Sequence, residues 1–123
     1  MTVASIVLAV LLALGFLPLG VLKALAVAAM SRRAEHFGYS VPAFRGIGAL
    51  EIAGALGVLG GIVWSPLGAA AGIGLALLMI GAVFTHVKVG DGVSEYAPSI
   101  GVGVLALAYV VTVFGTPLTL QEF

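Results

Sequence analysis

Four long apolar segments constrain the fold of this chain more than any other feature. They cover residues 3–29, 44–63, 67–87 and 98–114. A helix needs about 20 predominantly apolar residues to cross the hydrocarbon core of a bilayer, and each segment approaches or exceeds that length. The sequence therefore predicts an all-α integral membrane protein. We expect one domain, a four-helix bundle with antiparallel neighbours and short loops.

The composition agrees with burial in lipid. Hydrophobic residues make up 62% of the chain and charged residues only 8%, against about 25% charged residues in an ordinary soluble domain. Lys plus Arg and Asp plus Glu number five each, so no basic patch for nucleic acid is expected. The chain has no cysteine, which excludes disulfides and thiolate chemistry. Two histidines and five acidic residues are too few ligands for us to predict a metal site.

The first segment is predicted to stay in the protein as a membrane helix. No Lys or Arg precedes Ile6, so the positively charged start of a signal peptide is missing, and residues 3–29 are longer than its usual apolar core. Pro18 lies inside this segment and should kink the helix. After it, Arg32 to Phe37 are polar enough for a short helix at the membrane interface.

The positive charges of the loops predict the orientation. The connection between the first two segments carries Arg32, Arg33 and, at its boundary with the second segment, Arg45, and Lys88 lies between the last two segments. Both connections lie on the same side of a four-span protein, and loops rich in Lys and Arg stay in the cytoplasm. We therefore expect these two loops to be cytoplasmic and both termini to be outside. A bacterial cytoplasmic membrane is the expected location.

Two GxxxG pairs favour close packing of helices. Gly57 and Gly61 form one pair, and Gly68 and Gly72 form the other. Small residues at this spacing let membrane helices approach closely. With 18 glycines in the chain, such pairs also arise by chance. Packing inside the bundle is favoured over dimerisation.

Four ionisable residues are predicted to share one layer in the inner leaflet. Lys23 lies six residues before Ala29, and Glu51 lies six residues after Arg45, so each is about 9 Å inside its span. His86 lies at the corresponding end of the third span. An isolated carboxylate in hydrocarbon costs a few kcal/mol, and by depth Lys23 is the best partner for Glu51. The layer is predicted to be a ligand-binding or a structural site. A Lys–Glu pair that only fixes helix register explains the same pattern, and His86 and Arg45 also suit ordinary positions near the headgroups.

Three motifs in this order resemble the DoxX-like family of small four-helix membrane proteins. They are Gly-x-x-Lys at 20–23, Gly-x-x-Glu-x-x-Gly at 48–54, and the segment from Met79 to His86. The resemblance covers roughly residues 10 to 91. It implies a four-helix bundle in a bacterial cytoplasmic membrane. The family takes its name from a subunit of a thiosulfate:quinone oxidoreductase, and most members have no established reaction.

Three functions fit these observations. The first is a non-catalytic accessory subunit of a membrane complex, in contact with lipid and with other membrane subunits or a second copy, and without a cofactor or catalytic residues. The second is a quinone- or isoprenoid-binding component of a membrane oxidoreductase, with His86 or Lys23 holding the headgroup. The third is a proton-coupled small exporter that uses Glu51. A paired carboxylate exchanges protons less readily, so the exporter ranks last.

Overall fold

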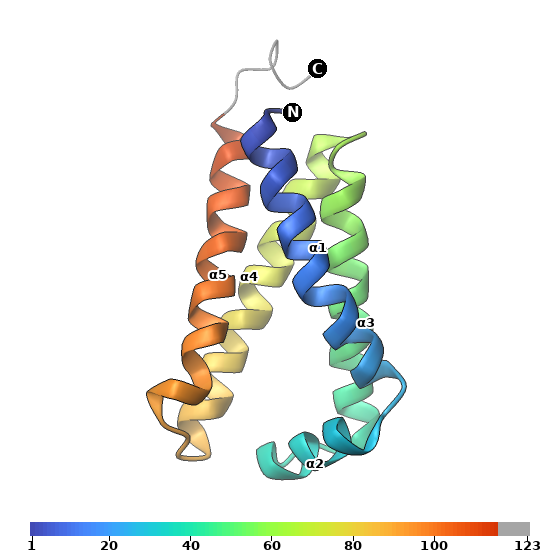
Figure 1. Cartoon of the computed structure of the whole chain (residues 1–123), viewed down its shortest axis with the longest axis vertical. Coiled ribbons are helices and arrows are strands. Elements are labelled where there is room, and N and C mark those ends of the chain that lie inside the picture. Colours follow the sequence, from blue (N-terminus) through green and yellow to red (C-terminus); the bar gives the residue numbers. More distant parts are fainter. Residues whose placement is uncertain (116–123) are drawn as a thin grey trace.

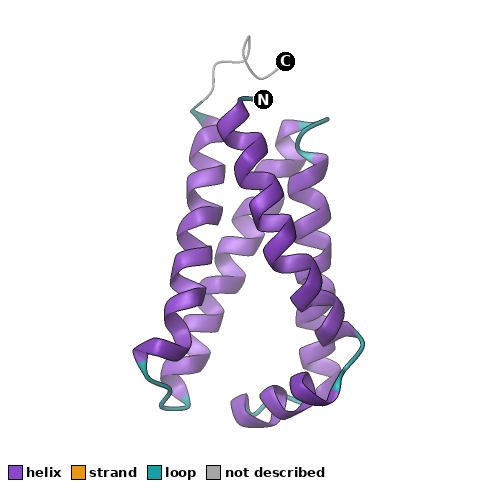
Figure 2. Ribbon diagram, in the orientation of Figure 1, coloured by secondary structure: helices purple, strands orange, loops and turns teal. Residues whose placement is uncertain are grey.

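The computed structural model describes residues 1–115, and these residues form five helices and no strand (Figures 1 and 2). Four of the helices are long and apolar enough to cross a membrane. The predicted all-α, multi-pass membrane fold is therefore confirmed. The bounds are α1 Val3–Ala24, α2 Ala28–Phe37, α3 Val41–Gly60, α4 Ser65–Lys88 and α5 Val93–Phe114.

The first span ends five residues earlier than predicted. We expected it to reach Ala29, but α1 ends at Ala24. Ala26 then takes a positive φ of 52°, a left-handed conformation that ends a right-handed helix. Lys23 consequently lies in the last turn of α1, and the depth that was counted from Ala29 is wrong. The turn is flanked by alanines, which do not indicate the end of a helix, so the sequence does not predict it.

The other helices begin earlier than predicted. Helix α3 begins at Val41, where the Ser40 hydroxyl caps it by accepting a hydrogen bond of 3.2 Å from the Ala43 amide. Helix α4 begins at Ser65, two residues before its predicted start, with Trp64 as its N-cap residue. Helix α5 begins at Val93, which leaves Pro98 inside the helix rather than at its start. Each of these helices therefore begins within residues whose polarity predicts a loop.

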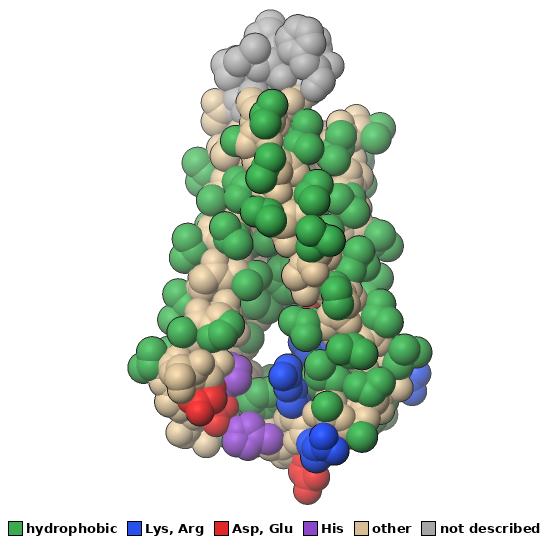
Figure 3. All heavy atoms as spheres, viewed as in Figure 1, with side chains coloured by type: hydrophobic (Ala, Val, Ile, Leu, Met, Phe, Trp, Pro, Cys, Tyr) green, Lys and Arg blue, Asp and Glu red, His purple; other side chains and the backbone are tan. Residues whose placement is uncertain are grey.

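The long helices form two antiparallel pairs. Helix α1 packs along α3, and α4 packs along α5. The pairs lie together near the N-terminus and separate toward the other end, where α2 runs crosswise below them (Figure 1). We call this second end the polar end, because it holds α2 and the turn between α4 and α5. Charged and histidine side chains gather there, while hydrophobic side chains cover the length of the helices (Figure 3).

Glycines join the two pairs at the end that carries the N-terminus. A Cβ atom added to Gly61 would lie 2.6 Å from Cα of Gly68, and one added to Gly57 would lie 2.5 Å from Cβ of Ala71. The hydroxyl of Tyr109, from α5, covers Gly61 and Gly68 and donates a hydrogen bond of 3.4 Å to the Val58 carbonyl. Gly72 also faces the Tyr109 ring. Both GxxxG pairs therefore pack inside the bundle, as predicted.

Helix α2 contains the short helix predicted at Arg32 to Phe37 and is longer than expected, and its place at the membrane interface stays a prediction. Its inner side places Met30 and Ala34 against Phe44 of α3, while Arg32 and Arg33 are exposed. Gly38 ends the helix with a φ of 79°, a conformation that glycine adopts without strain. The chain can therefore reverse at once into α3.

Candidate functional site

Two glycines bring α1 and α3 into backbone contact at the polar end. A Cβ atom on Gly20 would lie 2.9 Å from the Gly48 carbonyl oxygen and 3.2 Å from Cβ of Glu51. A Cβ atom on Gly48 would lie 2.7 Å from the Gly20 carbonyl oxygen and 2.6 Å from Cβ of Lys23. Each glycine thus leaves room for the charged residue of the opposite helix. The spacing Gly-x-x-Lys on α1 and Gly-x-x-Glu on α3 creates this reciprocal fit.

The crossing joins Lys23 to Glu51. The Lys23 ammonium donates a hydrogen bond to Oε1 of Glu51 and forms an ion pair with it. The side chain of Glu51 is only 2% exposed and that of Lys23 is 14% exposed. The ammonium also lies 5.4 Å from the centre of the Phe44 ring, within the range of a cation–π contact. The carboxylate that interrupts the apolar α3 is therefore neutralised within the fold.

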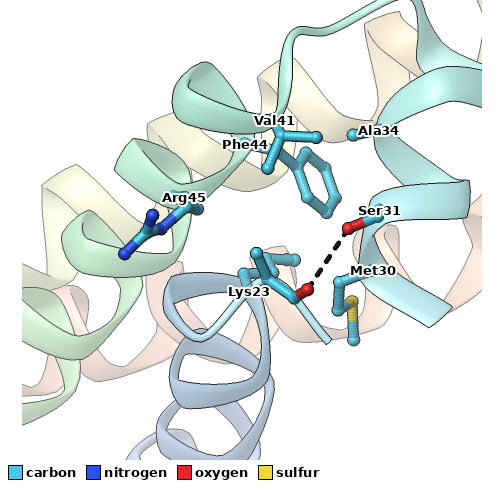
Figure 4. A pocket seen from close by; sticks show the side chains of 8 residues that line it. Lys23, Met30, Ser31, Ala34, Val41, Phe44 and Arg45 are labelled. Carbon is cyan, nitrogen blue, oxygen red and sulfur yellow. Dashed lines mark hydrogen bonds between the residues drawn. The ribbon is translucent and has the colours of Figure 1, made fainter. Parts of the chain in front are cut away.

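The space between Lys23, α2 and the start of α3 is filled. Figure 4 shows a recess in which Phe44 and Met30 lie near Lys23, while Arg45 points away from them. The Ser31 hydroxyl donates to the Ala26 carbonyl across 3.3 Å (Figure 4). The lining leaves no space for a water molecule. Within residues 1–115 every buried side-chain nitrogen or oxygen has a hydrogen-bond partner. The recess as described is therefore packed rather than open to a ligand.

Arg45 does not join the Lys23–Glu51 pair. It is exposed, and its Nε donates a hydrogen bond of 2.8 Å to the carbonyl of Ala24, the last residue of α1. The last carbonyls of a helix lack partners within the helix and carry a partial negative charge. Arg45 therefore caps α1 and fixes its end against α3.

His86 belongs to a separate polar cluster. Its Nδ1 lies 2.6 Å from Oδ2 of Asp91, in the turn between α4 and α5. The other oxygen, Oδ1, lies 2.8 Å from Nε2 of His36 on α2. An ionised carboxylate only accepts hydrogen bonds, so both imidazole rings donate to Asp91. The predicted layer is thus divided: Lys23 and Glu51 meet, while His86 pairs with Asp91.

Hydrogen bonds from His86 and then His36 lower the pKa of Asp91 below its usual value. The ionised form of Asp91 is favoured because both rings donate to it. Aromatic packing supports the cluster, since the Phe37 ring lies edge-on to His86 with 4.9 Å between the ring centres. Nearby, the hydroxyl oxygens of Tyr39 and Thr85 lie 2.8 Å apart. These contacts link the end of α2 to the end of α4.

Sequence reasoning missed Asp91 and His36 as members of a site. In the sequence, Asp91 lies in the connection between the last two apolar segments, and His36 lies in the predicted interfacial helix. Their sequence separation of 55 residues gives no local periodicity that would pair them. One available signal was the location of both residues in the two loops assigned to the same side of the membrane.

The arrangement supports helix positioning more directly than a reaction. One ion pair is buried and satisfied, and one cluster ties two loops together. In residues 1–115 no group of three or more His, Cys, Asp or Glu residues is arranged to hold a metal ion. Whether Lys23, Glu51, His86 and Arg45 bind a ligand stays a prediction.

Comparison with known proteins identifies the family. Searches of curated proteins and of solved structures found no match. The model of the DoxX-like family matches residues 7–111. This range contains α2, α3 and α4 in full and most of α1 and α5, and it includes the motifs that bring Lys23 and Glu51 together. The chain is a multi-pass membrane protein that belongs to the DoxX-like family.

Proposed function

We propose that this protein is a non-catalytic accessory subunit of a membrane complex. The observation that carries the proposal is the satisfied state of the Lys23–Glu51 pair. An acid or base that acts in catalysis has to reach its substrate, whereas Glu51 is 2% exposed and bonded to Lys23. Such a pair stabilises the arrangement of α1 and α3 and leaves the outer surface to act in binding.

The outer surface of α4 supports contact with a partner helix. Gly74 and Gly81 lie seven residues apart, which is close to two helical turns, so they share one side of α4. Both are exposed, and a Cβ atom added to either would meet nothing within 4 Å. Small residues on an exposed face let the backbone of another membrane helix approach closely.

Purification from native membranes tests the proposal. The tagged protein in mild detergent should recover a stable set of membrane proteins, and Gly81→Leu should reduce that recovery by blocking close approach on α4. Ala53→Leu is the matched control, because Ala53 is exposed on α3 and should leave recovery unchanged. Recovery of the protein alone would contradict the proposal, as would equal effects of the two substitutions.

An apolar groove favours a second candidate function, the binding of a quinone or an isoprenoid. The groove has a volume of about 230 Å³ and runs along α1 beside α3, lined by Val10, Ala13, Leu14, Leu17, Pro18 and Leu59. It suits an isoprenoid tail. His86 binds Asp91 through Nδ1, so Nε2 is the ring nitrogen that would meet a headgroup.

Native mass spectrometry from lipid nanodiscs distinguishes this candidate. A retained quinone or isoprenoid mass that disappears in Leu14→Trp, which fills the groove, would support it. Leu50→Trp is the control on an exposed part of α3 outside the groove. A protein without such a mass, and without a spectral change on addition of quinone, would exclude it. A proton-coupled exporter has less support, because Glu51 is both buried and paired.

A further inference from the structure

The two helix pairs are connected differently at their two ends. At the end that carries the N-terminus, α3 and α4 approach at Gly61 and Gly68, and Ser5 of α1 donates a hydrogen bond of 2.9 Å to Thr112 of α5. At the polar end the pairs separate, and Figure 3 shows an opening between them. Glycines thus let the pairs approach to backbone distance at the first end, whereas the pairs lie apart at the polar end (Figure 1).

Side chains bridge the polar end. His36 of α2 and His86 of α4 both donate to Asp91, across 2.8 Å and 2.6 Å. In Figure 3 a histidine side chain borders the opening on one side, and Lys or Arg side chains border it on the other. Helix α2 packs against α3 and α1, so it moves with that pair. The His36–Asp91 contact therefore joins one helix pair to the turn of the other. The Phe37–His86 and Tyr39–Thr85 contacts join the pairs at the same end.

We propose that His36, Asp91 and His86 form a pH-dependent latch that sets how far the α1/α3 pair and the α4/α5 pair separate at the polar end. When the latch is closed, α2 is held against the α4–α5 turn and the opening is narrow. When it is released, the pairs pivot about the Gly61–Gly68 contact and the opening widens.

The chemistry of the three groups gives the direction of the pH effect. Histidine ordinarily changes charge between about pH 5 and 8. A protonated ring makes a charge-assisted bond to a carboxylate that is roughly twice as strong as a neutral one. The latch is therefore tightest where both rings are protonated and Asp91 is ionised, and it weakens as pH rises through the histidine range.

The remaining charged groups near the latch do not replace its members. Glu95, in the first turn of α5, accepts a hydrogen bond of 3.1 Å from the Ser94 hydroxyl. Lys88 is exposed in the last turn of α4. On α2, the other charged side chains are exposed: Arg32, Arg33 and Glu35. The groups that face Asp91 are thus His36 from α2 and His86 from α4.

Distance measurement between two spin labels tests the latch. The chain has no native cysteine, so Gly46→Cys on α3 and Val93→Cys on α5 label one helix pair each. Both positions are exposed. In lipid nanodiscs, electron–electron double resonance should give a short, narrow distance distribution at about pH 5.5 and a longer, broader one at about pH 8.5.

Variants separate the latch from a general effect of pH. Asp91→Asn should give the longer distribution at both pH values. His36→Ala should do the same without disturbing the core, because the His36 side chain is 54% exposed. Glu95→Gln is the matched control and should respond to pH as the parent does. A parent distribution that is independent of pH would overturn the proposal, and so would a short distance retained in Asp91→Asn and His36→Ala.

Discussion

Asp91 shows how one carboxylate can join segments that are distant in sequence. It accepts hydrogen bonds from His86 and His36, and its side chain is 11% exposed. Glu51 instead has a single cationic partner and is buried among apolar helices. The two acids thus stabilise different contacts: Glu51 joins α1 to α3, and Asp91 joins α2 to α4.

Asp91 is predicted to titrate at a lower pH than an ordinary aspartate. The two imidazole donors lower the pKa of Asp91, so its contribution to stability is present above the pKa of an unfolded aspartate and is lost as pH falls through the lower folded value. A carboxyl-carbon NMR titration should place the midpoint of Asp91 below that of Asp in a model peptide. His86→Ala should raise the midpoint more than His36→Ala. A midpoint unchanged by both substitutions would contradict the assigned cause.

The contacts of individual charged side chains can be predicted only in part from the sequence. The Lys23–Glu51 contact is predicted from the similar depth of the two residues in their spans, although α1 ends at Ala24 and the depth counted from Ala29 is wrong. His86 was placed in the same layer, but depth alone does not say which way a side chain points. Helix α4 is apolar on most sides, so its rotation depends on tertiary packing. The sequence alone therefore did not show that His86 faces Asp91.

At the scale of helices, close backbone contact sets the position of α1 against α3. The carbonyl oxygen of Gly48 lies 2.9 Å from a Cβ atom added to Gly20, and that of Gly20 lies 2.7 Å from one added to Gly48. This contact depends on the absence of side chains at both positions. Helix ends were predicted less well than helices, since the turn at Ala26 has neither glycine nor proline.

Alanine substitutions in α3 test this crossing. Gly48→Ala should destabilise the protein, because its Cβ would lie 2.7 Å and 2.8 Å from backbone atoms of Gly20 and Ala24. The cost of such overpacking is about 1–3 kcal/mol. Gly46→Ala is the matched control, because nothing lies within 4 Å of its added Cβ and alanine favours helix. Thermal unfolding in detergent should show a lower Tm for Gly48→Ala only. Equal Tm values for the two variants would contradict the crossing.

At the scale of the whole molecule, the charged and histidine residues within residues 1–115 lie toward one end of four apolar helices. Helix α2, the α4–α5 turn and the Lys23–Glu51 pair all belong to that end, and the turn at Trp64 belongs to the other (Figure 1). The positive charges of the connections predict that the polar end faces the cytoplasm.

Labelling of single cysteines tests this orientation. Val63→Cys lies in the turn between α3 and α4, where Val63 is 92% exposed, and should react with a membrane-impermeant thiol reagent in intact cells. Arg33→Cys, exposed on α2, should react only after the cells are permeabilised. The reverse pattern would show that the orientation is wrong.

A double-mutant cycle on Lys23 and Glu51 tests the central claim, that the pair is a structural contact satisfied within the fold. Unfolding would be measured in lipid nanodiscs for Lys23→Met, Glu51→Leu and the double variant. Removing one partner leaves a buried charge and should cost about 3–5 kcal/mol. Removing both should cost less than the sum of the two single losses, with a coupling free energy of about 1–3 kcal/mol. Additive losses with no coupling would contradict the claim.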